Sequence, residues 1–226
     1  MCRYLPSNDC SHAFCNKNIL LVRHGRTDWN DSHRFQGRTD VPLNATGLAQ
    51  AKKVAARLAA WPFDAVYTSP MARARETAAA IAASREKAPV VMDELTEVNF
   101  GSWEGLFFEH IREQNGDRLQ EWLGDPFFNM PEGAETWDSI RLRAERARET
   151  VFRSSNKRVV MVSHGGTIRA LLSVLLGFDP HTIWNIKMSN CALSGIEVRK
   201  TQSSLVFSND ALHLDESLEG IPLSVW

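Results

Sequence analysis

Two histidines in this chain occupy the same kind of local sequence, a short apolar run that ends in a polar, glycine-containing turn. His24-Gly25 closes the run that begins at Ile19, and His164-Gly165-Gly166 closes the run that begins at Arg158. Both runs are typical of buried strands. Ligands of open α/β sheets bind beyond the carboxyl ends of the strands, so we expect both imidazoles to reach one crevice.

Two arginines are predicted to reach the same edge of the sheet. Arg23 directly precedes His24, and Arg73 falls in the first turn of a helix that we expect Ser69 to cap, with Pro70 as its first residue. A guanidinium group can hold two phosphate oxygens at once. Gly165 and its neighbour begin a further helix, whose N-terminal N–H groups favour an anion. The set therefore predicts a site for a phosphate dianion.

The elements around these residues alternate between strands and helices. This alternation predicts an α/β fold with a largely parallel sheet, and we expect one domain over residues 18–226, a poorly ordered tail over 1–17, and an insertion at about 99–135 that could cover the site. Strands are predicted at 19–22, 65–68, 90–92, 158–162, 192–198 and 205–207, and helices at 47–60, 70–83, 105–123 with a break around Gly116, 135–152 and 167–176.

Composition narrows the class of protein. The 26 basic and 27 acidic side chains give a formal net charge of −1, without the basic excess of a nucleic-acid binder. No apolar run approaches the roughly 18 residues that span a bilayer, and the polar N-terminus does not resemble a secretory signal. The four cysteines are read as reduced thiols. We therefore expect a cytoplasmic protein that binds neither nucleic acid nor membrane.

A metal site in the N-terminal tail is an alternative. Cys10, His12 and Cys15 could form part of one, but no second ligand pair at zinc-finger spacing follows. A solvated tail is the simpler interpretation, so we expect no metal and no cofactor.

Six sequence blocks in order resemble the signature of the histidine phosphatase superfamily, which includes the cofactor-dependent phosphoglycerate mutases. The resemblance implies a phosphoglycerate-mutase-like three-layer α/β/α sandwich. The blocks are LVRHGRTDWN (21–30), FQGRTDVPLNATG (35–47), TSPMARARETA (68–78), LTEVNFGSWEG (95–105), GAET (133–136) and VVMVSHGGTIRALL (159–172).

The resemblance also implies roles for matching residues. His24 corresponds to the nucleophile that becomes phosphohistidine, its other ring nitrogen donating to a backbone carbonyl in the Gly25 turn. Glu97 corresponds to the general acid, and we prefer it to Glu94 and Glu104, the latter being taken as structural or gating. The residues implied to bind the phosphoryl group are Arg23, Arg73 and His164, then Asn30 and Gln36, with Gly165 and Thr167 as further ligand contacts.

Several activities fit such a site. The short insertion and the Phe-Gly-x-Trp-Glu-Gly run favour a phosphatase over a mutase, because a mutase must exclude water. The phosphatase branch includes α-ribazole and broad-specificity phosphatases. A phospho-ligand binding protein of weak activity stays open. A serine hydrolase lacks its Gly-x-Ser-x-Gly elbow, and a metal hydrolase lacks a His-Glu-x-x-His helix. Two residues next to the nucleophile, Arg26 and Asp28, differ from those that many members of the family have at these positions.

The substrate is expected to be a small phosphorylated metabolite of unknown identity, and the oligomeric state is left open, a dimer being one option. The insertion carries Trp103, Phe107, Phe108, Ile111 and Trp122. These side chains either form the insertion's own core, or else Phe107 or Phe108 contacts the alcohol half of the substrate.

Overall fold

The computed structural model describes residues 16–199 and 202–215. The predicted tail therefore lies outside the described residues, apart from its last two positions, and so do Cys10, His12 and Cys15. Lys17 already belongs to the first strand and is only 3 % exposed.

Six strands form one mixed sheet at the centre of the molecule, in the order β3-β2-β4-β1-β5-β6. β3, β2, β4 and β1 run parallel to one another, whereas β5 is antiparallel to both of its neighbours, β1 and β6. The largely parallel sheet is thus confirmed, closed on one side by an antiparallel pair. The strands are β1 (Lys17–Arg23), β2 (Ala65–Thr68), β3 (Val90–Val91), β4 (Arg158–Ser163), β5 (Leu193–Val198) and β6 (Ser203–Asp210).

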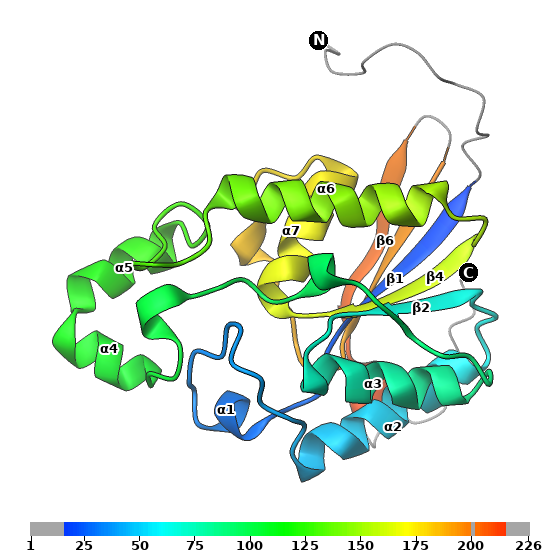
Figure 1. The fold of residues 1–226 in the computed structure, drawn as a ribbon, viewed down its shortest axis with the longest axis horizontal. Coiled ribbons are helices and arrows are strands. Elements are labelled where there is room, and N and C mark those ends of the chain that lie inside the picture. The colour runs from blue at the N-terminus through cyan, green and yellow to red at the C-terminus, as the bar shows by residue number, and fades with distance from the viewer. Residues whose placement is uncertain (1–15, 200–201, 216–226) are drawn as a thin grey trace.

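Helices cover both faces of the sheet (Figure 1). α6 (Trp137–Arg153) and α7 (Gly165–Leu176) pack on one face, and α2 (Ala45–Ala59) and α3 (Ala72–Ala83) on the other. β1 shows why: Ile19 and Leu21 pack into one apolar cluster, and Leu20 and Val22 into the other. Successive side chains of a strand point to opposite faces, so a wholly apolar strand needs a layer on each side. The three-layer α/β/α sandwich is confirmed.

Short elements complete the fold beside the sheet. The predicted helix at 105–123 forms as two helices that meet at Asn115, next to the expected break. These are α4 (Phe108–Gln114) and α5 (Gly116–Gly124), accompanied by α1 (Asp28–Asp31) and the 3₁₀ helices Asp93–Leu95, Gly101–Trp103, Ile183–Asn185 and Leu212–Leu214. Trp103, Ile111 and Trp122 are buried, so these apolar side chains form the core of the insertion.

Four predicted helices begin two residues away from the observed start, among them α2 at Ala45, α6 at Trp137 and α7 at Gly165, and for α3 the predicted cap is wrong as well. α3 begins at Ala72, not Pro70, and Ser69 is not its cap. The hydroxyl of Ser69 instead lies 2.8 Å from the ring of His164. The backbone N–H of Ala72 is satisfied by the carboxylate of Asp40, 2.7 Å away. A remote side chain therefore supplies the hydrogen bond that a local cap would give.

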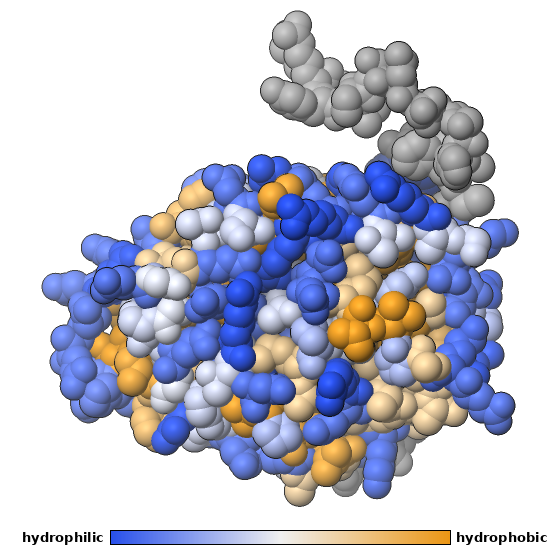
Figure 2. Space-filling view, in the orientation of Figure 1, coloured by the Kyte–Doolittle hydropathy of each residue, from blue (hydrophilic) through white to orange (hydrophobic). Residues whose placement is uncertain are grey.

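The face shown in Figure 2 is mostly hydrophilic, with apolar side chains in small separate patches. Within the described ranges, no helix combines the length and apolar character required to cross a bilayer.

Candidate active site

His24 lies at the end of β1, only 2 % exposed. Its Nδ1 is 2.7 Å from the carbonyl oxygen of Gly25, the hydrogen bond that the resemblance to the superfamily implied. A carbonyl only accepts, so Nδ1 carries the proton and Nε2 keeps its lone pair. Burial first, then the charges of Arg73 and Arg23, hold the pKa of His24 well below its usual value. The imidazole is therefore neutral, with Nε2 free to act as a nucleophile.

The backbone after His24 is fixed from several directions. The N–H of Gly25 donates to the hydroxyl of Thr77 on α3 at 3.1 Å. Asn190 donates its side-chain amide to the carbonyl of His24 at 3.0 Å. A Cβ atom at Gly25 would lie 2.6 Å from the carbonyl oxygen of Gly47, closer than real Cβ contacts allow. Glycine is thus needed here because two backbone segments meet.

His164 faces His24 across the same edge of the sheet, with ring centroids 5.0 Å apart. Arg73, which is fully buried, donates from Nε to Nδ1 of His164 at 3.2 Å. A guanidinium only donates, so Nδ1 of His164 accepts, and Nε2–H donates to the hydroxyl of Ser69. Burial and the neighbouring Arg73 lower the pKa of His164 well below its usual value. His164 is therefore a neutral imidazole of fixed tautomer.

The arginines retain donor capacity toward the cavity. Arg73 uses Nη1 and Nη2 to bind the carbonyls of Thr39 and Gly37, at 2.9 and 2.8 Å. Arg23 donates from Nη1 to the carbonyl of Met188, whereas its Nε is buried without a hydrogen-bond partner. Burial lowers the pKa of Arg73 to about 10 and that of Arg23 below its usual value, but both remain charged at neutral pH. An anion would satisfy these groups.

Arg23, His24 and Arg73 line one cavity of about 220 Å³, whereas His164 is fully buried behind them and does not line it. That volume lies below the roughly 300–1,000 Å³ of typical drug-sized sites, so the cavity suits a small ligand. The lining residues are Arg23, His24, Asn30, Arg34, Phe35, Gln36, Gly37, Arg73, Glu97, Phe100, Gly165, Gly166, Arg169 and Trp184.

Glu97 enters this cavity from the loop before the insertion and is 9 % exposed. Its carboxylate accepts hydrogen bonds from the backbone N–H groups of Val98 at 2.9 Å, Thr167 at 3.1 Å and Gly166 at 3.4 Å. Two of these donors begin α7, where the helix dipole favours negative charge. Glu104 lies elsewhere, bound to the backbone N–H of Arg38 and of Phe100. Of these two carboxylates, only that of Glu97 faces the cavity.

The remaining expected ligand contacts differ in their placement. Asn30, Gln36 and Gly165 line the cavity. The oxygens of Asn30 and Gln36 are bound to the hydroxyl of Thr27, at 3.2 and 2.9 Å. Thr167 is fully buried, does not line the cavity, and uses its N–H on Glu97. Thr167 therefore contacts the carboxylate rather than the open space.

Sequence reasoning missed a buried ion pair behind Glu97. Arg143 on α6 binds both carboxylate oxygens of Glu135, at 2.8 and 3.1 Å. Its Nη1 donates to the carbonyls of Glu94 and Thr96, at 2.9 and 2.7 Å, and to the hydroxyl of Thr167 at 3.2 Å. Arg143 thus ties the loop that carries Glu97 to two helices. The sequence signal available was the heavily charged predicted helix at 135–152, which reads as a solvated face.

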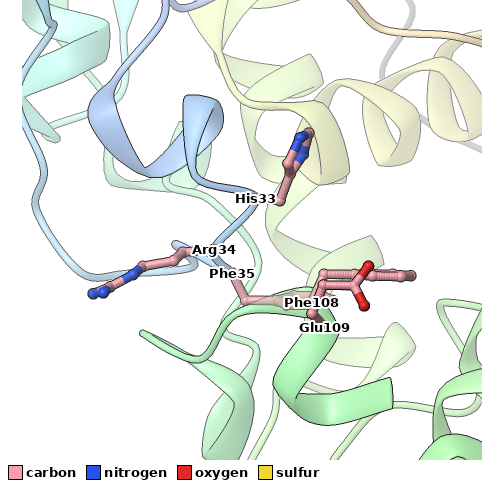
Figure 3. Close-up of a pocket in the computed structure, with 5 residues that line it drawn as sticks. All are labelled: His33, Arg34, Phe35, Phe108 and Glu109. Atoms are coloured by element: carbon pink, nitrogen blue, oxygen red, sulfur yellow. The ribbon is translucent and has the colours of Figure 1, made fainter. Parts of the chain in front are cut away.

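A second cavity of about 470 Å³, whose lining residues Figure 3 shows, shares Arg34 and Phe35 with the first. His33, Phe108 and Glu109 complete its lining. Phe107 is 42 % exposed and lines neither cavity. Of the two phenylalanines proposed to meet the substrate, only Phe108 therefore borders a cavity.

The described part of the chain contains no group of three or more His, Cys, Asp or Glu side chains arranged to hold a metal ion. The sheet order and this site together define an α/β/α sandwich with a cavity suited to a phosphate group. Over residues 19–211 the chain matches the histidine phosphatase superfamily, branch 1, and it belongs to that superfamily. The prediction of a phosphatase is thereby confirmed.

Similar proteins agree with this assignment. Phosphoserine phosphatase 1 of Hydrogenobacter thermophilus is 31 % identical over 199 residues, which cover 88 % of this chain and 94 % of that protein. Phosphoserine phosphatase of Entamoeba histolytica, solved as a mutant in complex with phosphoserine, has a TM-score of 0.77 at 30 % identity and covers 88 % of this chain and 100 % of its own. The α-ribazole phosphatase of Shigella flexneri has a TM-score of 0.75 at 26 % identity, over 85 % and 96 %.

Proposed function

We propose that this protein hydrolyses small phosphomonoesters through a phosphohistidine on His24 and needs no metal ion. One observation carries the proposal. The hydrogen bond from Nδ1 of His24 to the Gly25 carbonyl leaves Nε2 unprotonated, in a cavity that it shares with the guanidinium groups of Arg23 and Arg73. A neutral nucleophile beside two fixed cations suits attack on a dianionic phosphate ester.

In the first step, Nε2 of His24 attacks phosphorus in line, so the P–N bond forms as the bond to the ester oxygen breaks. Arg23 and Arg73 hold the phosphoryl oxygens and compensate the charge on them; the neutral His164 is proposed as a further contact, which it makes when its Nε2–H leaves Ser69 and donates to a phosphoryl oxygen. Glu97 gives its proton to the departing alkoxide. The donors around Glu97 (Val98, Gly166 and Thr167) then stabilise the carboxylate that remains.

In the second step, that carboxylate removes a proton from a water molecule, which attacks the phosphohistidine. The P–N bond breaks, inorganic phosphate leaves, and His24 and Glu97 return to their starting states. Asn30 and Gln36 lie on the same cavity wall and are proposed as further contacts to the phosphoryl group. The transfer needs no group other than water and these side chains.

We further propose that residues 18–226 act as one domain on a small phosphorylated metabolite in the cytoplasm. The cavity of about 220 Å³ supports a small substrate, and relatives that are named for phosphoserine and α-ribazole phosphate hydrolysis support a metabolite. The free, buried thiol of Cys191 agrees with a reducing compartment.

The test compares hydrolysis of p-nitrophenyl phosphate, with EDTA present, by the wild type, His24→Ala and the control His110→Ala, which alters an exposed histidine on α4. We expect activity in the wild type and the control, and a loss of roughly a thousandfold or more in His24→Ala, as for other nucleophile deletions. When Glu97→Gln is mixed with ³²P-labelled substrate, the protein should keep a covalently bound ³²P label. Treatment with acid should release this label.

Activity that survives in His24→Ala would contradict the role of His24. Activity that EDTA abolishes, and that added divalent metal restores, would contradict metal independence.

A further inference from the structure

Asn190 lies on the segment between α7 and β5, and its side-chain amide reaches the turn that follows β1. Its Nδ2 lies 3.0 Å from the carbonyl oxygen of His24 and 3.4 Å from that of Gly25. A backbone carbonyl only accepts hydrogen bonds, so the atom that faces these two oxygens is the amide nitrogen. Asn190 therefore has a defined orientation and a second N–H to donate.

The acceptor of that second N–H is the side chain of Asn30. Nδ2 of Asn190 lies 3.2 Å from Oδ1 of Asn30, and the backbone N–H of Thr27 donates to the same oxygen at 3.1 Å. A backbone N–H only donates, so this atom of Asn30 is its oxygen. The hydroxyl proton of Thr27 has a closer acceptor in Gln36, at 2.9 Å against 3.2 Å to Asn30. Thr27 and Asn190 therefore occupy the two lone pairs of the Asn30 amide oxygen.

The amide nitrogen of Asn30 is left for the cavity. Asn30 lines the cavity that contains His24. Throughout residues 16–199 and 202–215, no hydrogen-bond partner is found for its Nδ2. A run of two amides thus connects the carbonyl of His24 to a free N–H₂ group on the cavity wall. Asn190 itself does not line the cavity, so it can act on a ligand only through another residue.

The turn that carries Asn190 is itself held on both sides. Cys191 has a left-handed backbone with φ of +55°, and its N–H donates to the carbonyl of Arg23 at 2.9 Å. The N–H of Ser189 donates to Oδ1 of Asn209 on β6 at 2.6 Å. The turn is therefore bonded both to the end of β1 and to β6. A donor on such a fixed turn keeps its orientation while ligands exchange, which lowers the entropy lost on binding.

We propose that Asn190 is a positioning residue of the active site, which binds the amide oxygen of Asn30 and so directs the N–H₂ group of Asn30 at the phosphoryl group. This inference rests on the proposed function and explains how a residue outside the cavity takes part in it. Without Asn190, one of the two N–H groups that hold Oδ1 of Asn30 is lost. The amide then populates orientations in which its N–H₂ group does not face the cavity, and the contact to the phosphoryl oxygen weakens.

A double-mutant cycle tests this role with four proteins: the wild type, Asn190→Ala, Asn30→Ala and the double variant. The two readouts are kcat/KM for p-nitrophenyl phosphate and the Kd of inorganic phosphate from isothermal titration calorimetry. We expect Asn190→Ala to lower kcat/KM and phosphate affinity by about tenfold when Asn30 is present, the size of one hydrogen bond. When residue 30 is alanine, the same substitution should change them by less than about threefold.

A purely structural role would give the same factor in both backgrounds, and any effect of Asn30→Ala on α1 is present on both sides of the comparison. Asn185→Ala is the matched control, because Asn185 is exposed on the same segment and does not line the cavity. It should keep the wild-type values. Circular dichroism establishes that Asn190→Ala is folded; if it is not, Asn190→Ser takes its place in the cycle. Equal factors in the two backgrounds, or no effect of the substitution at Asn190, would overturn the proposal.

The binding measurement separates this inference from the proposed function. A wild type that hydrolyses the ester, but shows equal factors in both backgrounds, overturns the role of Asn190 and leaves the phosphatase intact. A wild type that binds phosphate with the expected coupling, but does not hydrolyse the ester, supports the role of Asn190 and contradicts the proposed function. A wild type that does neither overturns both.

Discussion

The backbone N–H of Thr167 lies 3.1 Å from Oε1 of Glu97, so a carboxylate from a distant loop caps the first turn of α7. Gly166 donates to the other carboxylate oxygen at 3.4 Å. The same helix begins next to His164, whose ring centroid lies 5.0 Å from that of His24. The start of α7 thus sets the position of the proposed general acid relative to the proposed nucleophile.

Gly166→Ala should disturb this relationship. The added Cβ would lie 2.8 Å from Cγ2 of Val98 and 2.9 Å from Oε1 of Glu97, so the Glu97 loop has to move. We expect kcat for p-nitrophenyl phosphate to fall by about ten- to a hundredfold, since small misplacements of reacting groups cost that much. Gly165→Ala is the control, because its nearest new contact, to Nη1 of Arg169, is 3.4 Å away. An equal loss in both variants would contradict this explanation.

Glu135→Gln should weaken the fold and the activity together. Arg143 and Glu135 are both nearly buried, and removal of one partner leaves an uncompensated charge, which costs roughly 3–5 kcal/mol in the free energy of unfolding. Because Arg143 also binds the carbonyls of Glu94 and Thr96, kcat should fall more than KM rises. Urea unfolding and steady-state kinetics measure the two effects.

The control for that experiment lies on the same helix. Glu145 pairs with Arg141 on the surface of α6, and such exposed pairs contribute about 1 kcal/mol or less. Glu145→Gln should therefore change stability little. A similar loss of stability in both variants would mean that the buried pair has no special role.

The sequence predicted what depends on local pattern. Apolar strands that end in His24 and His164 are visible as runs of residues, and the two-sided burial of β1 follows from its continuous apolar character. The cap of α3 was predicted wrongly, because the hydroxyl of Ser69 accepts the N–H of Met71, which precedes the helix, and is shared with His164, 95 positions away. Local propensity does not register such competition.

Contacts between remote segments explain the other omissions. Asn190 binds the carbonyl of His24 from 166 positions away, and nothing in the residues around Asn190 indicates that partner. Arg34 shows the same limit in another form. Its place on the cavity wall, over the ring of Phe107, is evident only from the fold, because an arginine in a polar loop is normally solvated.

The two buried histidines, His24 and His164, should make the fold sensitive to acid. The pKa values of His24 and His164 are lowered in the folded protein, whereas an unfolded histidine titrates near about 6.5. Below that pH the unfolded chain binds more protons than the native one, so stability falls as pH falls. Each histidine contributes up to about 1.4 kcal/mol per pH unit in this range. Urea unfolding at pH 7.5 and 5.5 measures the change, and replacement of both histidines by glutamine should reduce it. An undiminished change would contradict the assignment.

The exposed histidine His181 should make a contribution to stability with the opposite pH dependence. Nδ1 of His181 lies 2.6 Å from Oδ2 of Asp125, and its ring stacks on Phe128 with centroids 4.0 Å apart. The hydrogen bond to Asp125 raises the pKa of His181, so the pair contributes fully below the unfolded value and loses its contribution as pH rises through the folded one. NMR titration should give His181 a pKa above about 6.5 in the wild type and a lower value in Asp125→Asn.

Amide hydrogen exchange at residues 125–128, corrected for its intrinsic pH dependence, should be faster at pH 8 than at pH 6 in the wild type and equal at both in Asp125→Asn. Equal exchange at both pH values in the wild type would show that the protonated pair does not hold this loop against the segment after α7.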